Sequence, residues 1–194
     1  NQESDEENVF LSGGTGTLAE RIRGFNADMT SWSPPGCRAM QAALEHLRGA
    51  GRILLVHNTY TDGEDIAWLQ EFFRGEDEIF WCFCPGANQY IEGRLPEVPM
   101  FLPFSGHITI GTDSLASNTD LSVLEEIKIL SAAFPEISLD RLIRWGTLNG
   151  AAALGFEREL GSIDKGKTPG LNLIEKVNTG EMKLSPESRV RRLV

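Results

Sequence analysis

The chain has 194 residues, of which 41% are hydrophobic and 24% charged, as in an ordinary globular protein rather than a disordered or fibrous one. Its net charge of −10 argues against a general nucleic-acid binder, which would carry a basic face. No apolar run approaches the roughly 20 residues that cross a bilayer, so we expect no membrane span. The polar, acidic start NQESDEEN does not resemble a signal peptide, and three cysteines are too few for a disulfide framework. These features predict a cytoplasmic protein.

The first quarter of the chain shows helical spacing interrupted by one break. Apolar residues recur every three to four positions over 17–25, which predicts a helix. SWSPPG at 31–36 ends this pattern, because proline and glycine interrupt regular structure. A second helix is predicted over 37–48.

Three short apolar runs follow, at 53–56 (ILLV), 79–84 (IFWCFC) and 108–110 (ITI). Continuous runs of this length are typical of strands buried on both faces, as in a parallel sheet. Helical patterns lie at 65–73 between the first two runs, over a short stretch at 98–104 between the second and third, and at 121–134 after the third. The alternation predicts parallel βα units.

The last part of the chain has more helix and then a change of character. Helices are predicted at 139–145 and 149–156, the second with Asn149 as a candidate N-cap. The segments 161–176 and 189–194 instead indicate short strands joined by turns.

The number of predicted strands indicates the fold class. A complete eight-stranded βα barrel takes about 250 residues, whereas this chain shows three strands and none before residue 50. We therefore expect an α/β fold: the second half of such a barrel over residues 1–160, and a small β element over 161–194.

Polar residues follow each predicted strand. His57 follows the first, Asn88 lies in the loop after the second, and Asp113 follows the third. In parallel βα folds the chemistry gathers at the carboxyl ends of the strands, and an imidazole with a carboxylate suits metal ligation or proton transfer.

Each of these residues also has a plain structural explanation. His57 could be a hydrogen-bonded rim residue, Asn88 a turn former and Asp113 a helix cap. Cys82 and Cys84 alternate with the residue between them, so they share one face of a strand, where packing is their simplest role.

At these residues the sequence resembles the C-terminal half of the amidohydrolase superfamily, in the branch of chlorohydrolases and aminoheterocycle deaminases. The resemblance covers nearly all of residues 1–175. The matching segments, in family order, are LLVHNTYTDGEDIAWL, CPGANQYIEGRLPEVP, ITIGTDSLASNTDLSVLEEIKIL, WGTLNGAAALGF and LGSIDKGKTPGLNLIE.

The resemblance implies a distorted (β/α) barrel with one catalytic divalent metal, zinc or iron. It implies that Asp113 binds the metal and relays a proton, that His57 orients the attacking water or the substituent of the reacting carbon, and that Glu3 shuttles a proton to the ring. Asn88 matches a residue of the substrate-side loop. The segment 161–176 resembles strands that join a small β-sandwich.

Two departures from the family pattern matter. Of the usual protein ligands only Asp113 is present, whereas a catalytic zinc needs about three; we therefore expect this chain alone to hold no metal and to be inactive. Phe83 also stands where many relatives carry a histidine.

These residues predict the C-terminal part of a metal-dependent hydrolase of non-peptide C–N bonds, which deaminates an aminated heterocycle. The alternative is a metal-free binding or scaffold module that reuses the fold. The expected partners are a small-molecule substrate and either the missing N-terminal half or a second copy, because a half barrel leaves sheet edges unpaired.

Overall fold

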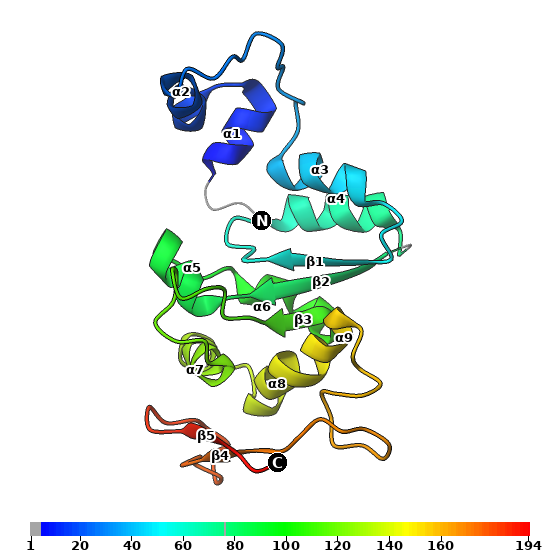
Figure 1. Ribbon diagram of the computed structural model, residues 1–194, viewed down its shortest axis with the longest axis vertical. Coiled ribbons are helices and arrows are strands. Elements are labelled where there is room, and N and C mark those ends of the chain that lie inside the picture. Colours follow the sequence, from blue (N-terminus) through cyan, green and yellow to red (C-terminus); the bar gives the residue numbers. More distant parts are fainter. Residues whose placement is uncertain (1–4, 76) are drawn as a thin grey trace.

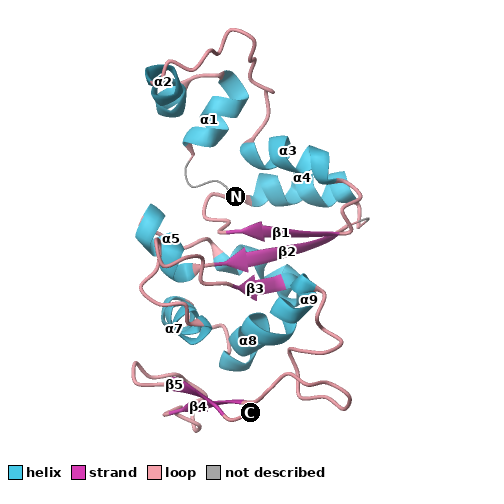
Figure 2. Cartoon of the chain, viewed as in Figure 1, coloured by secondary structure: helices cyan, strands magenta, loops and turns pink. Residues whose placement is uncertain are grey.

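The computed structural model describes residues 5–75 and 77–194 as an α/β protein whose elements follow one another along its long axis (Figure 1). The central sheet consists of β1 (Arg52–Val56), β2 (Glu78–Phe83) and β3 (Ile108–Ile110), in that order and all parallel (Figure 2). The predicted parallel strands are confirmed, each within about one residue of its apolar run.

Helices precede, connect and follow these strands. They are α1 (Glu6–Gly13), α2 (Gly16–Gly24), α3 (Ala39–Leu44), α4 (Gly63–Phe73), α5 (Pro85–Glu92), α6 (Val98–Phe101), α7 (Val123–Ala133), α8 (Leu139–Arg144) and α9 (Gly150–Leu154). Short 3₁₀ segments lie at Glu45–Leu47 and Leu102–His107, and a π-helical turn at Trp145–Asn149 joins α8 to α9.

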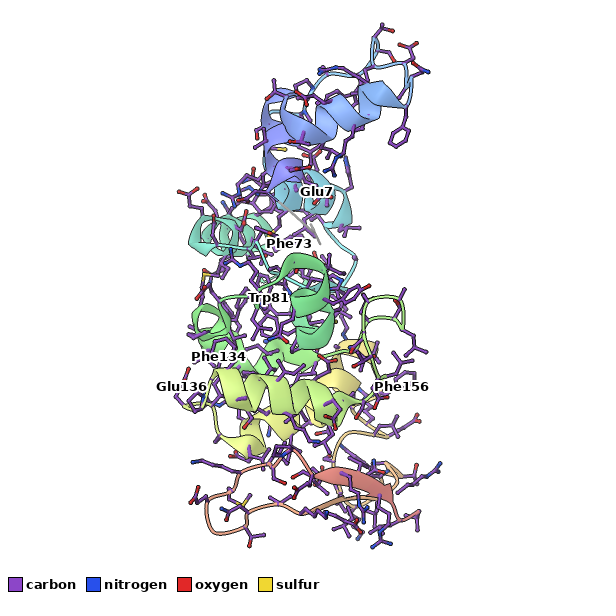
Figure 3. All side chains as sticks on the ribbon, turned by 90° about the vertical axis from the view of Figure 1, so that its left-hand side faces the viewer. Glu7, Phe73, Trp81, Phe134, Glu136 and Phe156 are labelled. Atoms are coloured by element: carbon purple, nitrogen blue, oxygen red, sulfur yellow. The ribbon has the colours of Figure 1, made fainter. Side chains whose placement is uncertain are left out.

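The main core lies between one face of the sheet and the helices. Trp81 of β2 is its centre: it is 1% exposed and packs edge-on against Phe101, with ring centroids 4.9 Å apart. In Figure 3, Trp81 lies between Phe73 of α4 and Phe134 at the end of α7. Burying large apolar side chains from sheet and helices together supplies the main stabilisation of the fold.

The opposite face of the sheet carries small residues near its carboxyl edge. Cys82 and Cys84 pack there with Ala87, and Val56 lies against them. The alternation of the two cysteines predicted this shared face.

Two helices were not predicted. α1 begins in the acidic opening segment, where Glu6 and Glu7 suit the positive end of the helix dipole. Phe10 of α1 stacks on Trp32 with ring centroids 4.5 Å apart, a tertiary contact that sequence spacing does not reveal. α5 is the other, and it turns the loop after β2 into two helical turns.

The expectation that Asn149 caps the last helix is wrong. Its backbone is helical and its side chain makes no capping bond. The amide Nδ2 instead donates to the carbonyl oxygens of Ile108 (2.8 Å) and Ser105 (2.9 Å), at the start of β3. Asn149 therefore ties the π-helical turn to the sheet.

The C-terminal part forms a separate two-stranded antiparallel sheet of β4 (Asn172–Glu175) and β5 (Arg189–Arg192). The short strands predicted within 161–176 and 189–194 are confirmed. The small β-sandwich and the boundary at residue 160 stay predictions. In the described part of the chain, no helix is long and apolar enough to cross a bilayer.

Candidate functional site

The strand pairing continues past the ends of the strands and sets the geometry of the site. The N–H of His57 donates to Cys82 O at 2.9 Å, and the N–H of Gly111 donates to Phe83 O at 2.9 Å. The residues that follow β1, β2 and β3 therefore leave the same carboxyl edge of the sheet, as the sequence predicts for His57 and Asp113.

The backbone turns sharply at His57. His57 and Asn58 both have left-handed backbone angles, with φ of 72° and 60°. Such conformations are costly for residues other than glycine and gather at functional sites. Asn58, fully buried, offsets this cost because its Nδ2 donates to Leu55 O (2.8 Å) and to Cys82 O (3.3 Å).

The imidazole of His57 carries an unused hydrogen-bonding atom. Its Nδ1 is buried and has no hydrogen-bond partner among residues 5–75 and 77–194. Buried polar atoms are usually paired, and an exception calls for an explanation such as a missing ligand.

Asp113 occupies a second strained position, with φ of 57°. Its Oδ2 accepts a hydrogen bond from Ser117 Oγ at 2.5 Å, which fixes the direction of the carboxylate. The carboxylate also lies close enough to Cys84 to contribute to the high pKa of that thiol, which arises first from its hydrogen bond with Cys82 and then from burial.

The side chain of Asn88 is occupied by the protein itself. It is fully buried on α5; its Nδ2 donates to Thr59 Oγ1 (2.6 Å) and Glu92 Oε2 (3.3 Å), and its Oδ1 accepts from the Cys84 N–H (3.3 Å). These bonds tie α5 to the loop that follows β1. A substrate-binding role for Asn88 stays a prediction.

Two other positions from the sequence analysis, Glu3 and Phe83, are not part of this cluster as the structure describes it. Glu3 falls in the segment that the structure does not describe. Phe83 is fully buried and packs against Phe101, with ring centroids 5.2 Å apart, so its side chain belongs to the helix-covered core.

A further acidic residue was missed as a site residue. Glu126 of α7 is 1% exposed, and it accepts hydrogen bonds from the N–H of Gly86 (2.7 Å) and from Asn118 Nδ2 (2.5 Å). Burial raises the pKa of its carboxyl. The paired glutamates that follow GTDSLASN were the only sequence signal for it.

The described residues by themselves do not fit a catalytic metal. Within 5–75 and 77–194, no group of three or more histidine, cysteine or acidic side chains is arranged to hold an ion. Asp113 and His57 supply a carboxylate and an imidazole, fewer than the three ligands or so that a catalytic zinc needs. No catalytic step is therefore derived through a metal here.

A parallel sheet with polar residues at its carboxyl edge places this chain in the general class of α/β proteins whose functional groups follow the strands. Comparison with known proteins narrows this class. The sequence profile of the amidohydrolase family matches residues 13–190. This chain belongs to the amidohydrolase family.

Curated relatives of the chain carry deaminase names. It is 28% identical over 130 residues to a 5-methylthioadenosine/S-adenosylhomocysteine deaminase of Moorella thermoacetica, covering 63% of this chain and 29% of that protein. It is 30% identical over 131 residues to a protein of the same name from Thermodesulfovibrio yellowstonii, covering 64% and 29%. The chain thus spans less than a third of the length of these relatives.

Solved structures agree on the fold. An adenosine deaminase from Xanthomonas campestris with bound zinc is 25% identical, with a TM-score of 0.58 over 80% of this chain and 35% of that one. The Helicobacter pylori aminofutalosine deaminase complex with methylthio-coformycin is 20% identical, with a TM-score of 0.72 over 89% and 41%.

Proposed function

We propose that this chain forms the C-terminal part of the catalytic domain of a metal-dependent deaminase that acts on an aminated heterocycle. The observation that carries the proposal is the pair His57 and Asp113, held in strained left-handed conformations at one carboxyl edge of the sheet. The names of the relatives favour an adenine nucleoside with a 5′-thioether as the substrate class.

In this proposal each residue has one task. Asp113, oriented by Ser117, would be one ligand of the metal, and its carboxylate would accept a proton from the attacking water. The Nδ1 of His57 is open to a hydrogen bond with that water or with the substrate. Glu3 passes a proton to the ring nitrogen, and Asn88 supports the substrate-side loop. The net reaction replaces the C–N bond by C–O, and the amine leaves as ammonia.

The metal is the part of the proposal that this chain does not complete. Zinc or iron would make hydroxide available near neutral pH. Its remaining ligands would come from another segment, which is the proposed role of an N-terminal half as partner.

The test is ammonia release from 5′-methylthioadenosine, S-adenosylhomocysteine and adenosine by the polypeptide as the cell makes it, with and without added zinc. We expect activity that Asp113→Asn lowers at least a hundredfold, because a metal ligand and proton carrier is lost. Glu125→Gln is the matched control, since Glu125 is exposed and forms a salt bridge with Lys128 on the surface of α7.

Two results would contradict the proposal. One is a well-folded polypeptide that releases no ammonia from any of these substrates; the other is full activity in the Asp113→Asn variant.

A further inference from the structure

Two loops at the carboxyl edge are joined by one buried carboxylate. The first is the junction of β2 and α5, which consists of Cys84 and the first two residues of α5, Pro85 and Gly86; the second follows β3 and carries Asp113. Glu126, on α7, lies between them and is almost completely buried.

Each oxygen of Glu126 bonds to a different loop. Oε2 accepts from the backbone N–H of Gly86 at 2.7 Å, and Oε1 accepts from Asn118 Nδ2 at 2.5 Å. The same amide nitrogen of Asn118 donates to Thr112 O at 2.8 Å, immediately before Asp113. A continuous set of hydrogen bonds therefore runs from Gly86 through Glu126 and Asn118 to the backbone beside Asp113.

The packing at Gly86 shows how closely the parts fit. A Cβ at this position would lie 2.8 Å from both terminal atoms of Asn118 and 2.9 Å from Glu126 Oε1. Only glycine leaves room for the carboxylate and the amide together. Buried carboxylates are costly unless such bonds compensate them, so this one has a specific structural use.

We propose that Glu126 is a positioning residue, which joins the loops after β2 and β3 and thereby fixes the orientation of Asp113. The inference rests on the proposed function only in assigning Asp113 its chemical role. The adjacent Glu125 is exposed and bonded to Lys128, so only one of the paired glutamates acts in this way.

The informative substitution is Glu126→Gln, which changes one oxygen to an amide nitrogen and keeps the size. Its remaining oxygen still accepts from Gly86, but the new amide faces the amide of Asn118, donor against donor. If Asn118 turns to present its oxygen instead, Thr112 O loses its donor. The loop that carries Asp113 then loses its hydrogen bond at Thr112 O, while the start of α5 keeps the hydrogen bond at Gly86.

Amide hydrogen exchange followed by NMR on the present chain reads out this difference. In Glu126→Gln we expect the Ser117 N–H, which bonds to Ser114 O within this loop, to exchange about tenfold faster, as for one lost buried hydrogen bond, with Gly86 little changed. In Glu126→Ala both amides should exchange faster. Glu125→Gln should leave both unchanged.

If Glu126 only caps α5, a different exchange pattern is expected. Glu126→Gln would then leave the exchange rate of the Ser117 N–H unchanged, and this result would overturn the inference.

The kinetic readout uses the polypeptide as the cell makes it. If Asp113 acts in the chemical step, Glu126→Gln should lower kcat about tenfold with KM nearly unchanged, whereas Glu125→Gln should change neither. Equal kcat in the two variants would contradict positioning. If the wild type releases no ammonia, the proposed function fails, but the exchange pattern still decides whether Glu126 joins the loops.

Discussion

At the scale of single residues, the site is built on strained backbone held by buried side chains. His57, Asn58 and Asp113 all have positive φ, a region that favours glycine. Asn58 holds this strained turn most directly, because its side chain bonds Leu55 O on β1, before the turn, and Cys82 O on the neighbouring strand β2. Asparagine tolerates this conformation better than most residues.

Two substitutions at Asn58 should separate the contribution of backbone strain to stability from that of the side-chain hydrogen bonds. Asn58→Gly removes the bonds and also the Cβ, which suits the positive φ, whereas Asn58→Ala removes the bonds and keeps a Cβ at positive φ. We expect both variants to lose stability by about 1 to 3 kcal/mol for the bonds, and alanine to lose about 1 kcal/mol more. Urea unfolding of the two variants measures the difference, and equal midpoints with equal slopes would contradict it.

At the scale of elements, the connection from α8 to α9 shows how a side chain can hold a helix against a sheet. The π-helical turn Trp145–Asn149 brings Asn149 beneath β3, where its amide satisfies two backbone carbonyls. Trp145, in the same turn, is fully buried and donates from Nε1 to Ser105 Oγ at 3.3 Å.

Asn149 can be explained as a tie to the sheet or as an N-cap, and the two explanations predict opposite effects of Asn149→Ser on stability. As a tie to the sheet, Asn149→Ala should cost about 1 to 3 kcal/mol, and Asn149→Ser should cost nearly as much because serine is too short to reach Ile108 O. As an N-cap, serine would replace asparagine with little loss. Thermal unfolding of both variants decides between them, and a stable Asn149→Ser variant would favour the cap.

At the scale of the whole molecule, the sheet of the described residues is open. In the order β1-β2-β3, the outer edges of β1 and β3 have no neighbouring strand among residues 5–75 and 77–194. A groove of about 520 Å³ runs along β1, between Ile53–Val56 and helices α1 and α3, and Leu54 in it is 39% exposed. Open edges with apolar neighbours favour association with another strand.

We therefore expect the isolated chain to self-associate in sedimentation experiments. Association should strengthen as salt is added, because the net charge of −10 repels like chains at low ionic strength. Leu54→Lys, which places a charge in the groove, should weaken association and leave the helix-covered core intact. A monomer at every salt concentration would contradict the prediction.

The sequence predicted the strands well because their signal is local. Runs such as ILLV and IFWCFC are buried on both faces, so composition alone marks them. It failed at α1 and at Asn149, where the outcome depends on partners distant in the chain: Trp32 stacked on Phe10, and the carbonyls of Ser105 and Ile108.

For the candidate site, the sequence by itself determined which chemical groups follow the strands: the imidazole of His57 and the carboxylate of Asp113. The alternation of strands and helices predicts parallel strands, and parallel strands place these groups at one edge of the sheet. Only the tertiary structure decided the network that holds them, because Gly86, Asn118 and Glu126 are up to 40 residues apart. Hydrogen bonds between distant segments depend on how helices pack on the sheet, and periodicity along the chain carries no record of that packing.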